Sequence, residues 1–353
     1  MDLIRSAFDL FYDAIKPVTF RLTRDNPKKA HKLFVRFCSL LDTTHLERIV
    51  LDNLSNQLTP DFELSNAAGF NKDGKISPEV LFYLGFDRAV IGTVTRDAWK
   101  GNTRPTIRRY SETESLVNWE GLPGEGAMAV AQRLAAYGNH GVPITINFMS
   151  TPKKQGDELL RDLEGTILAT KDLPYVDRFE LNISCPNTHS KSGSMDTREE
   201  NLRMLDSMLS VMEKNTSLRQ QHYLKVSPDS TQADVDDTVD VASHHMVDGV
   251  VTSNTSTVHD REYIPISPIV NGKRVGGASG NAVYQASLKT QILYAEKIRK
   301  LGLQWKLIAV GGINSAERVS ERLRHGATEI QIYTPLVFSG PRLIRQLRAY
   351  KRF

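Results

Sequence analysis

One of the two cysteines of this chain stands in a polar segment whose residue types are suited to acid–base chemistry. Cys185 lies in the run Asn182-Ile183-Ser184-Cys185-Pro186-Asn187-Thr188, between two asparagines. A thiol with an ordinary pKa of about 8.5 can act as a base that removes a proton from carbon. A lone cysteine is more often an inert packing residue, which is our interpretation of Cys38 on an apolar helical face. The polar surroundings of Cys185 favour the catalytic interpretation.

Lysine and asparagine residues recur where they could bind a planar, negatively charged ligand. Lys72 and Lys225 would bring positive charge to a substrate or cofactor that gains negative charge during a reaction. The alternative is that each lysine pairs with a nearby carboxylate such as Asp73 or Asp229. Asparagine amides offer donors and acceptors together, which suit a ring that carries amides, carbonyls and a carboxylate. The candidates are Asn118, Asn182, Asn187 and Asn254.

Two glycine-containing segments suggest a phosphate clamp. They are Gly276-Gly277-Ala278-Ser279-Gly280 and Gly311-Gly312. Glycine lets backbone N–H groups approach a phosphate closely, and barrel proteins often hold a phosphate beside their last two strands.

The elements that must position these residues are eight short apolar runs, most of them followed by a helical pattern. Strands that alternate with helices predict parallel pairing, and eight such units close a barrel. We therefore predict an α/β fold, a (β/α)8 TIM barrel with a short N-terminal helical extension. The alternative, an open doubly wound sheet, lacks an early Gly-x-Gly-x-x-Gly turn. The predicted strands are 64–70, 89–95, 144–149, 179–184, 223–227, 249–255, 307–313 and 330–335.

The chemistry of such barrels lies at the carboxyl ends of the strands, and polar residues follow almost every predicted strand. Before them, residues 1–55 predict two or three short amphipathic helices, one of them over 27–41 with Pro27 in its first turn. We assign 1–55 to a helical cap and 56–353 to the barrel. The cap either seals the base of the barrel or faces a membrane, because its apolar stripe is flanked by basic residues.

Composition narrows the class of protein. The 353 residues carry a net charge of +4 and are 24% charged, as in an ordinary globular protein and unlike a disordered tail. The two cysteines are too far apart to suggest a disulfide framework or a zinc site, so we expect a reducing compartment and no metal. No run approaches the ~18 apolar residues that cross a bilayer. The residues themselves predict no oligomeric state.

Five motifs resemble those of the dihydroorotate dehydrogenase family, and the similarity covers essentially the whole chain. They are 67–74 (AAGFNKDG), 91–95 (IGTVT), 182–188 (NISCPNT), 253–255 (SNT) and 310–313 (VGGI). The resemblance implies an FMN-dependent oxidation of (S)-dihydroorotate to orotate in pyrimidine biosynthesis, with Cys185 as the catalytic base. It implies substrate binding by Lys72, Asn118, Gly121, Leu122, Asn182, Asn187, Asn254 and Thr255. It implies FMN binding by Ala68, Gly69, Lys72, Thr93, Asn147, Asn182, Lys225, Ser253, Gly280, Gly311, Gly312, Tyr333 and Thr334.

The segment 30–37 (AHKLFVRF) is similar to the helix that leads quinone to the flavin in the quinone-dependent class. That similarity implies a quinone as electron acceptor, with His31, Arg109 and Tyr333 on the quinone side. It also implies peripheral membrane association, at the cytoplasmic face of a bacterial membrane or at the inner mitochondrial membrane.

Other residues keep alternatives open. Cys185 and Gly121-Leu122-Pro123 are similar to the soluble, fumarate-reducing enzymes, so fumarate or another dihydropyrimidine-like cyclic amide are the rival reactants. An RNA-modifying flavin barrel would need a basic domain beyond the barrel, and only a few basic residues follow Leu343, so we expect no nucleic-acid partner. A catalytically silent flavin- or membrane-binding protein is a third alternative.

Overall fold

The computed structural model describes residues 16–18, 21, 27–44, 62–103, 105–138, 141–183 and 198–348. Within them, eight parallel strands form a sheet in the order β1-β13-β12-β8-β7-β6-β5-β2. Each predicted strand overlaps one of these eight, and the barrel prediction is confirmed. Their bounds are β1 Glu63–Asn66, β2 Ala89–Val94, β5 Ile144–Phe148, β6 Val176–Asn182, β7 Gln221–Val226, β8 Gly249–Thr252, β12 Lys306–Val310 and β13 Ala327–Ile332.

Side-chain hydrogen bonds of Asn66 help to close the ring between β1 and β2. The fully buried Asn66 donates from Nδ2 to the carbonyl of Val90 at 2.7 Å and accepts from the Val90 N–H at 3.0 Å. Parallel bridges join Ser65 to Arg88 and Asn71 to Ile91 on either side of it. An amide side chain can replace a backbone ladder because it carries the same donor and acceptor pair. The sheet therefore curls into a nearly closed barrel.

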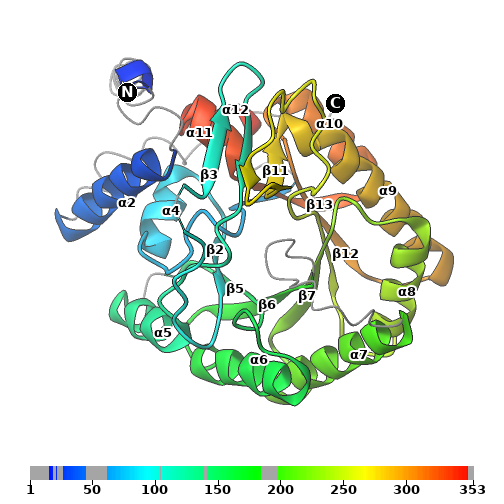
Figure 1. Ribbon diagram of the computed structural model, residues 1–353. Helices are drawn as coiled ribbons and strands as arrows, with labels where there is room; N and C mark the ends of the chain where they lie inside the picture. Colours follow the sequence, from blue (N-terminus) through cyan, green and yellow to red (C-terminus); the bar gives the residue numbers. More distant parts are fainter. Residues whose placement is uncertain are drawn as a thin grey trace.

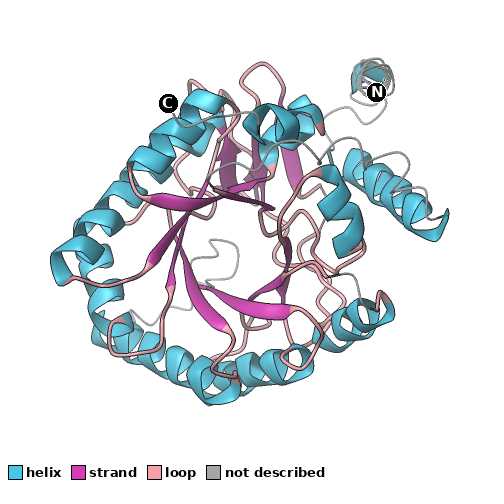
Figure 2. Cartoon of the chain, turned by 180° about the vertical axis from the view of Figure 1, so that it is seen from behind, coloured by secondary structure: helices cyan, strands magenta, loops and turns pink. Residues whose placement is uncertain are grey.

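Helices surround the strands, as Figures 1 and 2 show from opposite ends. Several begin or end at residues that cap the helix. Thr231 and Asp234 form a capping box at the start of α8, and Gly302 ends α9 in a left-handed conformation. The helices are α4 Pro78–Leu84, α5 Ala127–Ala136, α6 Gly156–Thr170, α7 Arg198–Asn215, α8 Gln232–Ala242, α9 Tyr284–Leu301, α10 Ala316–Arg324, α11 Thr334–Ser339 and α12 Arg342–Arg348, with a short 3₁₀ turn at Asn281–Val283.

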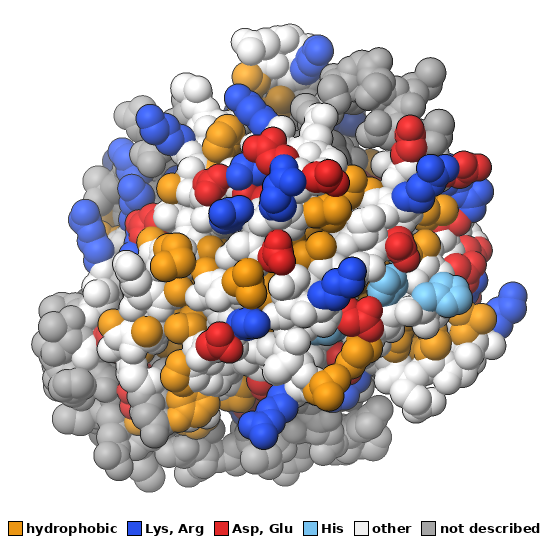
Figure 3. Space-filling view, turned by 90° about the horizontal axis from the view of Figure 1, so that it is seen from below, with side chains coloured by type: hydrophobic (Ala, Val, Ile, Leu, Met, Phe, Trp, Pro, Cys, Tyr) orange, Lys and Arg blue, Asp and Glu red, His pale blue; other side chains and the backbone are white. Residues whose placement is uncertain are grey.

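Ion pairs join neighbouring helices on the outside. Arg198 of α7 pairs with Asp237 of α8, and Lys297 of α9 pairs with Asp236 and Asp240, which also belong to α8. On the face seen in Figure 3, basic and acidic side chains likewise lie interspersed among apolar ones. Exposed pairs of this kind stabilise a protein by ~0–1 kcal/mol each, so the barrel depends mainly on its buried interior.

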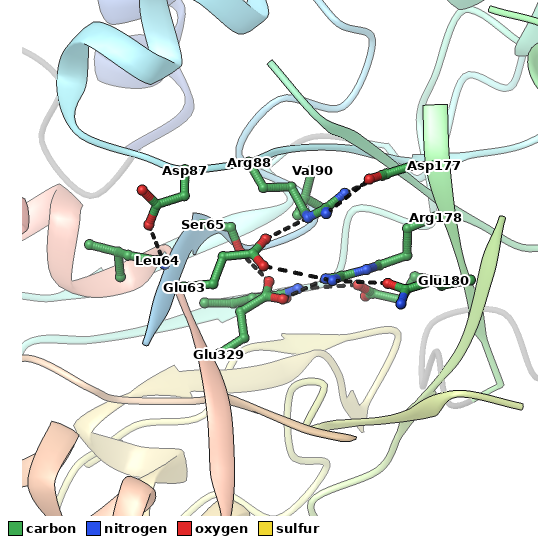
Figure 4. A network of polar contacts seen from close by, with 12 residues as sticks. Glu63, Leu64, Ser65, Asp87, Arg88, Val90, Asp177, Arg178, Glu180 and Glu329 are labelled. Carbon is green, nitrogen blue, oxygen red and sulfur yellow. Dashed lines mark hydrogen bonds and ion pairs between the residues drawn. The ribbon is translucent and has the colours of Figure 1, made fainter. Parts of the chain in front are cut away.

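An ionic network fills the base of the barrel, at the amino-terminal ends of the strands (Figure 4). Arg88 pairs with Glu63 at 2.5 Å and also with Asp177. Arg178, only 3% exposed, pairs with Glu329 and lies with its guanidinium carbon 4.6 Å from the centre of the Tyr223 ring. Burial lowers the pKa of Arg178, but Glu329, Tyr223 and Glu63 together outweigh burial, so that the pKa is raised. Each arginine of this network is paired with a carboxylate, and pairing compensates charges that would be costly to bury alone.

A three-stranded antiparallel sheet lies beside the barrel, and we did not predict it. It consists of β3 Ile107–Tyr110, β4 Ser115–Asn118 and β11 Gly277–Gly280, with β4 in the middle. A small antiparallel hairpin, β9 Ile269–Val270 and β10 Lys273–Arg274, precedes β11 in the chain. The segment 276–280 that suggested a phosphate clamp is therefore mostly a strand. The sequences of β3 (IRRY), β4 (SLVN) and β11 (GASG) contain no apolar run as long as those by which we recognised the barrel strands.

The helix α2, Pro27–Thr44, begins at the predicted Pro27 and extends three residues beyond the predicted end. It lies outside the ring of helices, next to α4 and β3 (Figure 1). Cys38 is 1% exposed and packs in the core, as predicted, and burial raises the pKa of its thiol. The predicted domain boundary at residue 55 falls in 45–61, outside the described residues. None of the helices in the described ranges has the length and hydrophobicity to cross a membrane.

Candidate active site

A cavity opens at the carboxyl ends of the barrel strands and collects most of the predicted site residues. Of these, the following line the cavity: Ala68, Gly69, Lys72, Thr93, Asn118, Gly121, Leu122, Asn182, Lys225, Ser253, Asn254, Thr255, Gly311, Gly312, Tyr333 and Thr334. They come from eight different segments of the chain. Seven of them lie at the carboxyl ends of barrel strands, which meet at one rim, and the eighth, 118–122, begins at the end of β4 in the outer sheet.

A buried carboxylate that the sequence analysis missed lies under the cavity. Glu180 is fully buried, and its Oε1 lies 3.4 Å from the ammonium nitrogen of Lys225. It also accepts from Asn147 Nδ2 at 2.7 Å and from Gln331 Nε2 at 3.2 Å. Asn147 therefore lies below the cavity wall instead of lining it. Glu180 and Asn182 are two residues apart on β6 and face the same side, so strand periodicity could have identified Glu180.

Amide and hydroxyl groups continue this network across the cavity wall. Asn147 Oδ1 accepts from Thr93 Oγ1 at 2.6 Å, and Asn254 Nδ2 donates to Asn182 Oδ1 at 3.1 Å. On the opposite side, Asn118 at the end of β4 donates to the carbonyl of Gly277 at 3.3 Å. These bonds orient the amide side chains before any ligand binds, which reduces the entropy lost on binding.

Lys72 pairs with Glu120, another cavity residue that we had not singled out. The second oxygen of Glu120 lies 2.6 Å from the ammonium nitrogen of Lys28, which α2 contributes. Burial raises the pKa of the Glu120 carboxyl, but Lys72 and Lys28 outweigh this effect and hold that pKa below its usual value. The alternative partners considered from sequence, Asp73 and Asp229, instead contact Lys75 and the hydroxyls of Ser256 and Thr257.

Two arginines of α10 hold the glycine turn after β12. Arg322 donates to the carbonyl of Gly311 at 3.1 Å, and Arg318 donates to that of Gly312 at 2.6 Å. Both glycines have positive φ, 122° and 66°, and a Cβ on Gly312 would lie 2.5 Å from the carbonyl oxygen of Gly280. Gly280 thus supports the turn from behind and is not among the cavity-lining residues. Ser279 and Thr334 lie beside it, their hydroxyls 2.9 Å apart.

An aromatic cluster joins α2 to the cavity wall. The ring of Phe70 lies 5.5 Å from that of His31, and 5.7 Å from those of Phe34 and Tyr333. Burial, followed by the nearby charge of Lys72, lowers the pKa of His31 to about 4, so its ring is neutral at pH 7. Arg109 is 6% exposed on β3, the strand next to α2. The three predicted quinone-side residues therefore lie at α2, at β3 and in the cavity wall.

Cys185 and Asn187 lie outside the described residues, which stop at Ile183 and resume at Arg198. Their predicted roles stay predictions. The described end of β6 reaches Asn182 at the cavity, two residues before this segment begins.

Comparisons with known proteins agree with the geometry. A profile of the family described as dihydroorotate dehydrogenase matches residues 57–349. A relative from Natronomonas pharaonis, named dihydroorotate dehydrogenase (quinone), is 30% identical over 95% of this chain and 92% of its own length. One of the same name from Rhizobium leguminosarum bv. trifolii is 32% identical over 81% of this chain and 76% of its own. The barrel and its rim define an α/β-barrel oxidoreductase, and the chain belongs to the dihydroorotate dehydrogenase family.

Solved structures show the same fold. The complex of the Eimeria tenella enzyme with ferulenol superimposes with a TM-score of 0.74 at 21% identity, covering 92% of this chain and 91% of that one. The ligand-free structure of the Eimeria tenella enzyme gives 0.73, covering 92% and 94%.

Enzymes of this family use a flavin, and the cavity fits one. Gln331 lines the cavity floor, and its buried Oε1 accepts no hydrogen bond from any residue that the structure describes. A buried acceptor without a donor costs about 1–3 kcal/mol, so a ligand N–H would stabilise it. Lys225 adds a cation, the asparagines add amides, and Gly311 and Gly312 leave room for close approach. This donor set matches a ring system that carries both N–H and carbonyl groups.

Proposed function

We propose that this protein oxidises (S)-dihydroorotate to orotate and passes the electrons to a quinone, with FMN as its cofactor, in pyrimidine biosynthesis. Membership of the dihydroorotate dehydrogenase family supports the reaction, and the names of the relatives support the acceptor. The observation that carries the proposal is the convergence of Lys72, Asn118, Asn182 and Asn254 on one cavity above Lys225.

The substrate would be bound by side chains whose hydrogen-bonding groups and charge are complementary to its ring and its carboxylate. Amide side chains of Asn118, Asn182, Asn187 and Asn254 would bind the ring N–H and carbonyl groups, and Lys72 the carboxylate. Gly121, Leu122 and Thr255 would complete the site with backbone groups and apolar surface. Their role is to hold the ring in one orientation, so that the reacting bonds need little further ordering.

Cys185 would be the base. Its thiolate removes a proton from C5 while the hydride leaves C6, and the electrons of the C5–H bond form the new double bond of orotate. The proton stays on the sulfur until product has left and then passes to solvent. Cys185 stands between two asparagines in a polar segment of the sequence, and polar surroundings support a reactive thiol more than an apolar environment would.

Bound FMN supplies the hydride acceptor and carries the electrons onward. The cavity-lining residues proposed to hold it are Ala68, Gly69, Thr93, Asn182, Ser253, Gly311, Gly312, Tyr333 and Thr334, and Asn147 and Gly280 would support them from behind the cavity wall. Lys225 would stabilise the negative charge that the reduced ring gains, and Lys72 would lie where ring and substrate meet.

The quinone would enter beside α2, past His31, Arg109 and Tyr333. A neutral His31 and the rings of Phe34 and Phe70 give this side a weakly polar surface suited to an apolar ring. Residues 1–55 would then form a cap on the barrel 56–353 and associate peripherally with the membrane that holds the quinone. That membrane would be the bacterial one at its cytoplasmic face, or the inner mitochondrial membrane.

The test is anaerobic flavin reduction by dihydroorotate, followed by turnover with a short-chain quinone or with fumarate. We expect rapid bleaching of the flavin, turnover with quinone and none with fumarate. Cys185→Ala should slow the bleaching by roughly 10² to 10⁴, and Cys38→Ala is the matched control. Protein that carries flavin yet is not reduced by dihydroorotate would overturn the proposed substrate, and an unchanged rate in Cys185→Ala would overturn the base.

A further inference from the structure

The cavity contains a carboxylate beside the lysine proposed to bind a carboxylate substrate. Glu120 lines the cavity, its side chain is 10% exposed, and it pairs with Lys72. Like charges in a buried site repel strongly, so Glu120 opposes an anionic substrate unless its own charge is compensated.

Lys28 supplies that compensation from outside the barrel. It lies in the first turn of α2, and its ammonium nitrogen is 2.6 Å from Glu120 Oε1, while Lys72 takes the other oxygen. Two ammonium groups against one carboxylate leave the cluster with one net positive charge. His31, the other titratable group of α2 near Lys72, is neutral at pH 7 and adds nothing.

The backbone around Glu120 is fixed, so only side chains can rearrange. The N–H of Asn102 donates to the Glu120 carbonyl at 2.8 Å, and Asn102 Nδ2 donates to the Trp119 carbonyl at 2.7 Å. Trp99 and Gly124 exchange two backbone bonds of 2.9 Å. When a ligand carboxylate binds Lys72, the Glu120 carboxylate therefore remains at the cavity and needs another cation.

We propose, on the basis of the proposed function, that Lys28 is a positioning residue for the anionic substrate: it holds Glu120 so that Lys72 is released to bind the substrate carboxylate. Docking of α2 thereby becomes a condition for tight substrate binding, since without Lys28 the cluster has no net charge. The N-terminal helix and the substrate site are coupled through one ion triad.

The first test measures orotate binding by calorimetry to the flavin-loaded full chain. Lys28→Met should weaken binding about tenfold, the usual effect of one lost charged interaction. Glu120→Gln should strengthen it, and the double variant should return close to wild type because its net charge is restored. Lys29→Met, at an exposed site of the same helix, is the matched control and should change nothing.

A second measurement distinguishes a lost charge interaction from a general disturbance of the folded site. Uracil has the same ring without the carboxylate, so its affinity should be the same in Lys28→Met and wild type. The Lys28→Met effect on orotate should also shrink as salt is raised. In turnover assays the variant should raise KM for dihydroorotate more than it lowers kcat.

The outcomes are distinguishable. Failure of the wild-type protein to bind orotate at all would refute the proposed substrate. Wild-type binding with an unchanged Lys28→Met affinity, or equal losses for orotate and uracil, would overturn the role of Lys28 while the proposed function stands.

Discussion

Lys225 and Glu180 form a buried pair in which the ammonium nitrogen lies 3.4 Å from the carboxylate oxygen, with 4% and 0% of the two residues exposed. A lysine alone at this position would present a full positive charge to the cavity. The carboxylate behind it offsets much of that charge, and the amides of Asn147 and Gln331 offset the carboxylate in turn. The positive charge that Lys225 presents to the proposed flavin is therefore set by its buried partner Glu180.

The first prediction concerns the reduction potential of the bound flavin. Glu180→Gln leaves the charge of Lys225 unopposed and should raise the midpoint potential by about 30 mV, which is roughly 1.4 kcal/mol for two electrons. Lys225→Met should lower it, because the reduced ring then loses its counter-charge. Spectroelectrochemical titration of both variants measures this. Shifts of the same sign in the two would contradict an electrostatic role for the pair.

The second prediction concerns the base of the barrel. Arg178→Met leaves Glu329 buried without its cation and should cost about 3–5 kcal/mol of unfolding free energy. Arg203→Met removes an exposed pair with Glu199 and should cost less than about 1 kcal/mol. Urea denaturation gives both values. A double variant with Glu329→Gln should recover part of the loss; if it were no more stable than Arg178→Met, the unpaired charge would not be the cause.

The third prediction concerns the glycine turn after β12. Gly312 and Gly302 have nearly the same positive φ, 66° and 67°, but only at Gly312 would a Cβ meet backbone, 2.5 Å from the Gly280 carbonyl oxygen. Gly302→Ala should cost about 1–2 kcal/mol for the left-handed conformation alone. Gly312→Ala should cost more and reduce the flavin retained on purification. Absorbance of bound flavin per chain checks this, and equal retention in the two variants would argue against a cofactor role for the turn.

The fourth prediction concerns pH. The pKa of His31 falls from an ordinary 6.5 to about 4 on folding because burial, and next the charge of Lys72, disfavour the imidazolium. Between these values the unfolded chain binds the proton and the folded chain does not, so stability falls as pH drops from 6.5 toward 4. Above 6.5 this contribution is constant. Urea midpoints measured across pH 4–8 should fall less steeply toward low pH in His31→Phe than in wild type. Parallel curves for the two proteins would contradict the role of His31 in this loss of stability.

Much of the fold could be predicted from the sequence, because each barrel strand is a local apolar run followed by a polar rim residue. Eight such runs dictate parallel pairing and bring Thr93, Asn182, Lys225 and Asn254 to one end. The outer sheet of β3, β4 and β11 could not be predicted, since β3 and β4 lack a long apolar run and Gly277–Gly280 resembles a loop until it pairs with β4.

The sequence alone determined which residue types stand at the strand ends, since hydrophobic periodicity is a local property. Only the tertiary structure decided their partners. Lys72 pairs with Glu120, 48 positions away, and Lys225 with Glu180, 45 positions away, while the adjacent Asp73 is engaged elsewhere. Lys28 reaches Glu120 across 92 positions. Charge pairing depends on distance in space and on burial, and neither is encoded in the spacing of residues along the chain.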